Sequence, residues 1–422
     1  MQCSYLGKSS GKGGLELWTH NLKSREVIEE YSSEYYNGPA LKLGAGVQGH
    51  EAYEIAERYG YRVVGGSCPT VGIAGGYSQG GGHSALSSIH GLSADNILEW
   101  EIVTSDGEHL LATPSKNQDL YWALSGGGGG TYAVVLSMTT RLHPDGPISG
   151  AYLRFNDQDV GNDVYWDAIN AFHSYMADFA TDGVTALYSI YNNSFNLFSV
   201  SAPNKTTYEV VSRFEPILAA LDERGINFSF DAYTSPTFFD HYVRDFGPLP
   251  NGYFSAGQLT SSRLVPRDVL GDPDKNEAMT KAFRQTAQNG DFFIACQALD
   301  VSNKSRSVAP NAVLPAWRDA ATHCIVVGLW DYSLPRDVME ARQKRIEDEI
   351  NPILIAATPG SGTYLNEANF RQADFQEHFF GDNYDKLLAV KKKYDPDDVF
   401  YVTTGVGSDA FVVDDSGRLC RA

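Results

Sequence analysis

The sequence has few cysteines, no excess of positive charge and no long apolar run. Its 422 residues include five cysteines, none in a C-x-x-C pair, so a zinc or redox site of that type has no support. We expect Cys296 and Cys324 to be two separate buried thiols, with a disulfide between them as the alternative. The formal net charge of −19 disfavours nucleic acid and anionic membranes as partners. No apolar run approaches the roughly 20 residues that a membrane-spanning helix needs.

The first residues, MQCSYLGKSSGKGG, are polar and rich in glycine, unlike a secretory signal. Four N-x-S/T triplets nevertheless indicate a route through the secretory pathway, although such triplets also arise by chance. They begin at Asn192, Asn204, Asn227 and Asn303.

The chain length allows two or three domains, and composition shifts indicate where they meet. The turn-forming run HPDGP ends a glycine-rich region, so we predict domains at 1–147, 148–358 and 359–422. Hydrophobic patterns predict strands and helices in the first two regions. The predicted strands cover 41–43, 61–64, 133–142 and 186–190, with a hairpin at 98–112; the predicted helices cover 50–59, 210–221 and 336–350.

The stretch CPTVGIAGGYSQGGGHS, residues 68–84, contains a G-x-S-x-G motif centred on Ser78. This motif is typical of the nucleophile elbow of a serine hydrolase, and Asp331 with His378 could complete a triad. However, the three glycines that follow Ser78 begin a helix poorly, which argues against this interpretation.

A second motif, G-x-G-x-x-G at 44–49, follows a predicted strand and precedes a predicted helix. A dinucleotide-binding unit needs an acidic residue at the end of the next strand, and that strand ends in Val-Val-Gly-Gly instead. We therefore expect residues 44–49 to form only a strand-to-helix turn.

Two glycine runs, 72–82 and 126–130, flank the 98–112 hairpin. Glycine has no Cβ, so its N–H groups can approach a large flat or anionic ligand closely. Tight turns are the simpler alternative. An unused run of five glycines would more often be a linker, but this run lies between Trp122 and a predicted strand.

Several motifs together resemble the FAD-binding domain of the berberine bridge enzyme-like flavin oxidases, within the vanillyl-alcohol oxidase superfamily. They are GGSCPTVGIAGGYSQGGGHS, GLSADNI and DLYWALSGGGGGTYAVV, with YLNEA, FGDNYDKL and KYDPDDVF near the C-terminus. The resemblance implies an α+β fold, in which a PCMH-type FAD-binding domain is covered by a substrate domain on an antiparallel sheet. The 359–422 segment would return to the FAD domain.

The resemblance also implies which residues hold FAD. The Cys68 sulfur would be able to bond covalently to the flavin, although a small buried hydrophobic role is the alternative. Tyr364 is the expected catalytic base, and Asn366 would meet the ring from the substrate side. The other expected FAD-binding residues are Thr70, Val71, Gly72, Gly75, Gly76, Ser78, Gly80, Gly81, Gly82, Asp95, Asn96, Ile97, Gly127, Gly128, Gly129, Gly130 and Val134.

The resemblance begins at about Tyr5, so we expect the given sequence to lack the family's first FAD subdomain. Cys3 falls where the family usually has a second flavin-linking histidine. The implied function is oxidation of a small, secondary-metabolite-like substrate by hydride transfer to FAD, with O₂ as the electron acceptor. The alternative is a flavin-free binding protein or cyclase on the same scaffold.

Overall fold

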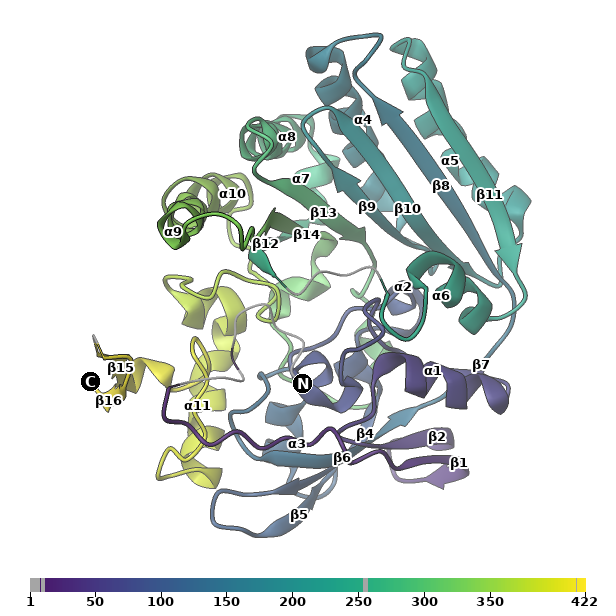
Figure 1. Ribbon diagram of the computed structural model, residues 1–422. Coiled ribbons are helices and arrows are strands. Elements are labelled where there is room, and N and C mark those ends of the chain that lie inside the picture. The colour runs from purple at the N-terminus through teal and green to yellow at the C-terminus, as the bar shows by residue number, and fades with distance from the viewer. Residues whose placement is uncertain (1–7, 9–11, 253–256, 415) are drawn as a thin grey trace.

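The structure is a computed structural model that describes residues 8, 12–252, 257–414 and 416–422; Cys3 and Tyr5 lie outside the described residues. Its two large sheets are both antiparallel and lie in different parts of the molecule (Figure 1). The five-stranded sheet is at the bottom of the view and the seven-stranded sheet at the top. This mixture of antiparallel sheets and helices confirms the predicted α+β fold class.

The smaller sheet has the strand order β1-β2-β6-β4-β5. Apolar side chains on its inner face, including Leu41, Trp100 and Met138, are buried in one core. It contains the predicted strands near 41–43 and 133–142 and the 98–112 hairpin. Its strands are β1 (Arg25–Ser32), β2 (Asn37–Gly44), β4 (Ile97–Val103), β5 (His109–Ala112) and β6 (Val134–Arg141). A separate pair joins β3 (Tyr61–Arg62) and β7 (His143–Pro144).

Helix α1 (Gly49–Arg58) confirms the helix predicted at 50–59. The carboxylate of Glu51 accepts a hydrogen bond from the backbone N–H of Gln48, which caps the first turn. Ala52, Tyr53 and Ala56 form its buried stripe.

Two glycines of the 44–49 turn, Gly44 and Gly46, are required by close packing against the N-terminal segment. A Cβ on Gly46 would lie 2.2 Å from the carbonyl oxygen of His20, and one on Gly44 would lie 2.4 Å from that of Leu22. Protein backbone therefore takes the space that a nucleotide phosphate would need. The expected strand-to-helix turn is confirmed.

The larger sheet has the order β11-β8-β10-β9-β13-β14-β12. Helices α4 and α5 lie along one face of it (Figure 1), and Phe172, Tyr188 and Phe195 fill the core between the layers. Its strands are β8 (Ile148–Asn156), β9 (Thr185–Ile190), β10 (Ser194–Pro203), β11 (Phe228–Ser235), β12 (Gln258–Pro266), β13 (Phe293–Ala298) and β14 (Ala320–Leu329). The helices of this part are α4 (Asn162–Phe179), α5 (Thr207–Glu223), α6 (Phe238–Phe246), α7 (Arg267–Gly271), α8 (Pro273–Ala287), α9 (Arg336–Arg345) and α10 (Asn351–Ala357).

The C-terminal segment returns to the first part of the chain. Its helix α11 (Tyr384–Tyr394) packs against α3 (Gln118–Leu124), and Asp119 accepts hydrogen bonds from Lys393 and Tyr394. The remaining elements are α2 (Ser87–His90), the pair β15 (Phe411–Val413) and β16 (Leu419–Arg421), and short 3₁₀ or π turns at 73–77, 93–96, 304–306, 315–318, 346–350, 376–380, 381–383 and 408–410. Within the described ranges, no helix is both long and apolar enough to cross a membrane.

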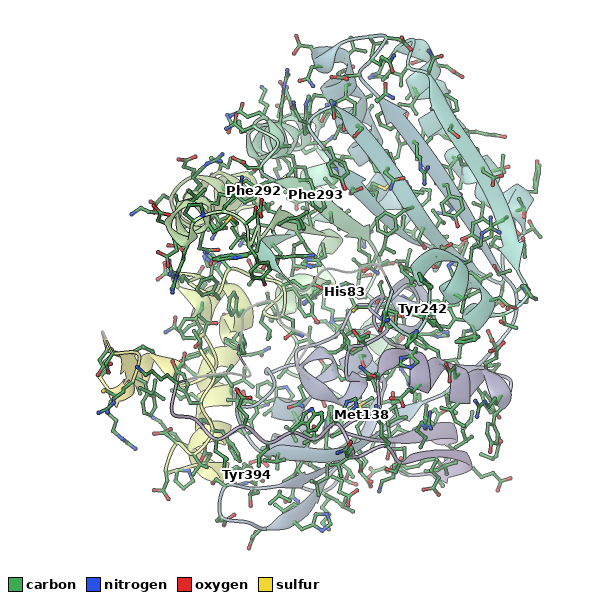
Figure 2. All side chains as sticks on the ribbon, in the orientation of Figure 1. His83, Met138, Tyr242, Phe292, Phe293 and Tyr394 are labelled. Atoms are coloured by element: carbon green, nitrogen blue, oxygen red, sulfur yellow. A yellow bond between two sulfur atoms is a disulfide. The ribbon has the colours of Figure 1, made fainter. Side chains whose placement is uncertain are left out.

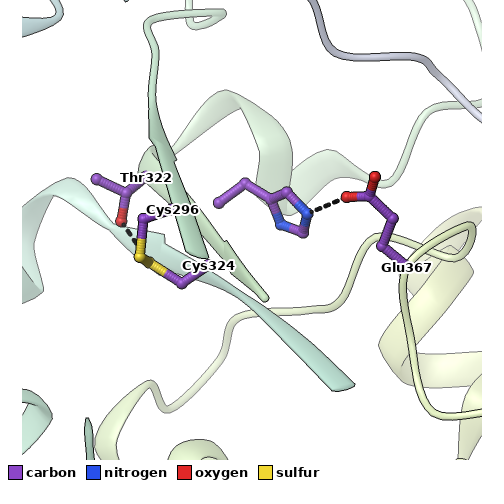
Figure 3. The surroundings of a disulfide bond; sticks show 5 residues. Cys296, Thr322, Cys324 and Glu367 are labelled. Atoms are coloured by element: carbon purple, nitrogen blue, oxygen red, sulfur yellow. Dashed lines mark hydrogen bonds and ion pairs between the residues drawn. A yellow bond between two sulfur atoms is a disulfide. The ribbon is translucent and has the colours of Figure 1, made fainter. Parts of the chain in front are cut away.

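Cys296 and Cys324 form a disulfide, so the expectation of two separate thiols is wrong (Figure 3). The two cysteines are register partners on the neighbouring strands β13 and β14. This pairing places their side chains on the same face of the sheet, within bonding distance. A separation of 28 residues in the sequence gives no indication of that register.

Candidate active site

A cavity of about 300 Å³ lies between the glycine-rich loop near residues 66–83 and the seven-stranded sheet. In Figure 2, His83 and Tyr242 lie between the two sheets, and Phe293 lies on the side of the seven-stranded sheet. The loop contributes Gly66, Ser67, Cys68, Val71, Tyr77 and His83 to the lining. The sheet contributes Leu187, Ser189, Tyr191, Asn196, Phe198, Gln258, Phe293, Ala295, Cys296, Gln297, His323, Ile325 and Val327, and the C-terminal segment contributes Tyr364 and Glu367.

Two buried tyrosines fix the loop that carries Cys68. The Tyr53 hydroxyl donates a hydrogen bond of 2.8 Å to the Gly66 carbonyl, and the Tyr242 hydroxyl donates one of 2.9 Å to the Ser67 carbonyl. Burial raises the pKa of both tyrosines, so both remain protonated donors. The Cys68 backbone is thereby held at the cavity wall.

The Cys68 thiol is half-buried, and its Sγ lies 3.6 Å from Thr70 Oγ1. The neighbouring Ser67 hydroxyl is buried and, among the described residues, has no hydrogen-bond partner. A thiol and an unsatisfied hydroxyl therefore stand together on the cavity wall. Both suit contact with a polar group of a bound molecule better than they suit a packed apolar core.

The second half of the glycine run packs against the C-terminal segment. A Cβ on Gly80 would lie 2.5 Å from Asn366 Nδ2, so only glycine allows this approach. The Asn366 amide donates hydrogen bonds of 2.8 Å to the Gly76 carbonyl and 2.8 Å to the Tyr364 hydroxyl. Gly81 and Gly82 adopt φ angles of +117° and +75°, which favour glycine. The structure thus brings the predicted residues Tyr364 and Asn366 onto the predicted glycine loop.

The serine hydrolase interpretation is wrong because the Ser78 hydroxyl is buried in a structural role. It donates a hydrogen bond of 2.6 Å to the Ile73 carbonyl, and its Oγ lies 2.7 Å from Ser93 Oγ. His378 Nδ1 instead lies 3.4 Å from the Arg263 guanidinium. Asp331 is exposed and caps its own turn.

Asp95 has a complete set of partners within the protein. Its carboxylate receives hydrogen bonds of 2.7 and 2.9 Å from Arg318, one of 2.9 Å from the Leu92 N–H and one of 2.7 Å from the Asn311 amide. Burial opposes ionisation, but Arg318 outweighs it and lowers the pKa of Asp95. These bonds join the loop before β4 to the segment before β14, whereas the predicted contact of Asp95 with FAD stays a prediction.

Asn96 is bonded within the protein in the same way. Its amide donates to the carbonyls of His90 and Leu92 at 2.9 and 2.8 Å, and its side-chain oxygen accepts from Arg141 and His143. The predicted contacts of Asn96, and of Ile97 at the start of β4, with the cofactor likewise stay predictions.

The second glycine run is also shaped by packing. A Cβ on Gly127 would lie 2.5 Å from the Ala123 carbonyl oxygen, whereas one on Gly128 would meet only Leu365 Cδ1, at 3.8 Å. The N–H groups of Gly126 and Gly128 both donate to the Gln79 carbonyl at 2.9 Å, so the two glycine runs lie side by side. The run leads through Gly129 and Gly130 to Val134, the first residue of β6. The open side of Gly128 is compatible with the predicted cofactor contact.

Sequence reasoning missed a cluster formed by His83, His323 and Glu367. Oxygen Oε2 of Glu367 lies 3.0 Å from His83 Nε2 and 2.7 Å from His323 Nε2; Figure 3 marks the second contact. Burial disfavours charge on His83, but Glu367 outweighs burial and raises its pKa. Burial lowers the pKa of His323. Burial opposes charge on Glu367, yet the two histidines hold its pKa well below the usual value.

The Tyr364 ring lies among the cluster and Trp317. Its centroid is 5.3 Å from that of His83 and 5.5 Å from that of His323, both edge to face, and 5.4 Å from that of Trp317. The side chain is buried, and it lines the cavity. Tyr364 is therefore positioned to contact a molecule in the cavity.

Comparison with known proteins identifies the family. A model described as "Berberine and berberine like" matches residues 363–407, and one described as "FAD binding domain" matches residues 2–113. The VAO-type flavoprotein oxidase VAO615 of Thermothelomyces thermophilus is 51% identical over 99% of this chain and 72% of its own length. The chain belongs to the VAO-type flavoprotein oxidase family.

Other VAO-type relatives agree. The bifunctional decalin synthase calF of Penicillium decumbens is 44% identical over 99% of this chain and 73% of its own length. The crystal structure of the VAO-type flavoprotein MtVAO615 from Myceliophthora thermophila C1 has a TM-score of 0.95 at 50% identity. It covers 99% of this chain and 76% of its own. These findings do not favour a flavin-free protein.

This member of the VAO-type family is an FAD-linked oxidoreductase. The residues present fit the flavin at the cavity. Cys68 and the unsatisfied Ser67 hydroxyl lie on one wall, and the adjoining loop is rich in glycine, which has no side chain to block a flat ring. Cys68, Ser67 and Val71 would hold its ring system, and the open side of Gly128 leaves room for backbone contact.

Proposed function

We propose that the protein oxidises a small, uncharged, ring-bearing or polyketide-like substrate in this cavity and passes the electrons to O₂. The observation that carries the proposal is the cavity itself, which combines the Cys68 wall with an apolar sheet face. When bound, FAD supplies the redox chemistry by taking a hydride from the substrate and passing the electrons to O₂. The chain's own residues bind the substrate, orient it and move its proton.

The lining indicates the substrate class. The sheet presents apolar side chains, among them Leu187, Phe198 and Phe293, with a few polar groups such as Asn196 and Gln258 between them. Among the described residues, no lysine or arginine lines the cavity, so it offers neither side chain to pair with a carboxylate or phosphate of a substrate. The printed name of the Penicillium decumbens relative, a decalin synthase, supports a carbon-rich polycyclic substrate.

We assign proton removal to Tyr364, whose hydroxyl accepts the 2.8 Å hydrogen bond from Asn366. Such a donor stabilises the phenolate that a tyrosine base must pass through. Tyr364→Phe should lower kcat by roughly 10²-fold or more while the flavin absorbance is kept. Tyr191→Phe is the matched control, because Tyr191 also lines the cavity but is 40% exposed at its rim. Equal activity of both variants would refute this role.

The first experiment is the visible spectrum of the purified chain before and after acid precipitation. Yellow colour in the pellet, lost in Cys68→Ser, would show a covalent link at Cys68. Cys420→Ser is the control, because Cys420 is the other free cysteine in the described part of the chain and is exposed. Oxygen uptake and H₂O₂ release with a panel of polycyclic alcohols and polyketides then test the oxidase function. A folded, colourless protein would refute the proposal.

We also propose that the protein passes through the secretory pathway. The disulfide suits an oxidising compartment, and Asn204, Asn227 and Asn303 are exposed. Expression in a fungal host followed by peptide N-glycosidase treatment should lower the apparent mass. An unchanged mass together with a cytosolic location would contradict this proposal.

A further inference from the structure

We propose that His83, His323 and Glu367 form a binding site for a divalent transition metal ion, of which Zn²⁺ is the representative. One ligand atom from each residue lies within 4.8 Å of the other two. The three residues come from the glycine loop, from β14 and from the C-terminal segment, and all three line the cavity. They therefore surround one point at the wall of an accessible space.

The donor set is one that proteins use for such ions. Two imidazole nitrogens and one carboxylate oxygen suit Zn²⁺ or Fe²⁺, and three protein ligands leave a position open for a further molecule. Ligand atoms at about 2.0–2.1 Å from a tetrahedral ion lie about 3.4 Å apart. The two Nε2–Oε2 distances are now 3.0 and 2.7 Å, so each of these two pairs would lengthen by about half an ångström when the ion binds.

The charge balance favours a cation at this point. Within the described ranges, the ion-pair partners of Glu367 are the two histidines, and neither a lysine nor an arginine reaches it. A buried carboxylate needs a compensating charge. A metal ion would supply that charge without requiring either histidine to be protonated.

A nearby side chain is suited to support one ligand. A metal-bound histidine usually donates its other ring N–H to an acceptor. His83 Nδ1 and Gln297 Oε1 are both buried and, in the described part of the chain, both lack a hydrogen-bond partner. Both residues line the cavity, and the Gln297 oxygen would accept the Nδ1 proton once Nε2 holds the ion.

The open position of the ion would face the cavity. There it would bind a hydroxyl or carbonyl oxygen of the substrate and polarise it. This consequence rests on the proposed oxidase function, whereas binding of the metal ion does not.

The test uses the untagged full chain, because a histidine tag itself binds Zn²⁺. The protein is treated with chelating resin, equilibrated with Zn²⁺ alone and desalted, and its metal content is measured by plasma mass spectrometry. We expect one Zn²⁺ per chain in the wild type and a loss of at least tenfold in His323→Asn and Glu367→Gln. His109→Gln is the matched control and should keep full occupancy, because His109 pairs with Glu101 at 2.9 Å on the surface.

Circular dichroism and flavin absorbance of each variant show whether the variant is folded and still holds FAD. If both variants misfold, the thermal midpoint of the wild type decides, since Zn²⁺ should raise it and Mg²⁺ should not. Sub-stoichiometric Zn²⁺ in the wild type would overturn the proposal, as would full occupancy in folded His323→Asn and Glu367→Gln. Because flavin is measured separately, a colourless protein that binds Zn²⁺ would refute only the oxidase function.

Discussion

The Asp95 carboxylate provides a sharp test of whether the GLSADN motif serves the cofactor or the fold. Asp95 is 1% exposed, and all four of its hydrogen bonds come from protein donors. In Asp95→Asn, the new amide NH₂ must face either the Arg318 guanidinium or the Leu92 N–H, and both are donors. Removing one partner of a buried ion pair costs about 3–5 kcal/mol, so we expect the free energy of unfolding to fall by about 4 kcal/mol.

Guanidinium unfolding followed by tryptophan fluorescence measures this loss, and flavin content is measured on the same samples. Asp163→Asn is the matched control, because Asp163 also pairs with an arginine, Arg284, but its side chain is 91% exposed. That pair should contribute little, so the control midpoint should stay close to the wild-type value.

A double-mutant cycle with Arg318→Gln separates the pair from its surroundings. If the Asp95–Arg318 ion pair accounts for most of the lost stability, the free energy of unfolding of the double variant should fall by much less than the sum of the two single decreases. Unchanged stability of Asp95→Asn with loss of flavin would refute the reasoning and make Asp95 a cofactor ligand.

Three further predictions concern stability. Burial and nearby arginines lower the pKa of His90 to about 3, so between pH 6.5 and 3 the unfolded chain binds a proton that the folded chain does not. The free energy of unfolding should therefore be about 2 kcal/mol lower at pH 5 than at pH 7. Urea titrations of His90→Gln at the two pH values should lack this difference. In Gly126→Ala, the new Cβ would lie 2.3 Å from the Val313 backbone nitrogen, so its thermal midpoint should fall well below that of Gly107→Ala, which has a positive φ but open space. The disulfide closes a loop of 28 residues, so Cys296→Ala with Cys324→Ala should lose about 3–4 kcal/mol and become insensitive to reductant; an equal effect of reductant on both proteins would contradict this.

Local patterns predicted the elements of the fold correctly where each segment determines its own structure. The 50–59 helix carries its apolar stripe and its stop at Gly60, which adopts φ +76°. The 98–112 hairpin turns at Gly107, which adopts φ +88°. In both cases the deciding contacts lie within a few residues, so the sequence pattern contains them.

Contacts between distant segments could not be read in this way. Cys296 and Cys324 meet because β13 and β14 pair in one register, and a shift of one residue would place them on opposite faces. Arg318 reaches Asp95 across 223 positions. Neither residue carries a local signal of its partner, so Asp95 was interpreted through the family motif as a cofactor ligand.

The metal-ligand cluster depends on such long-range placement more than any other part of the site. His83 and Glu367 are 284 positions apart, and Glu367 and His323 are 44 apart. Glu367 follows Asn366 directly in the sequence. The Asn366 amide donates a hydrogen bond to the Gly76 carbonyl, and it can lie this close to the loop because Gly80 has no side chain. The 72–82 glycine run therefore has a second structural role beside its predicted contact with the cofactor. Its close packing with the C-terminal segment brings the Glu367 carboxylate to the two histidines. A cofactor wall and a polar cluster thus share one loop, and a change at Gly80 would disturb both.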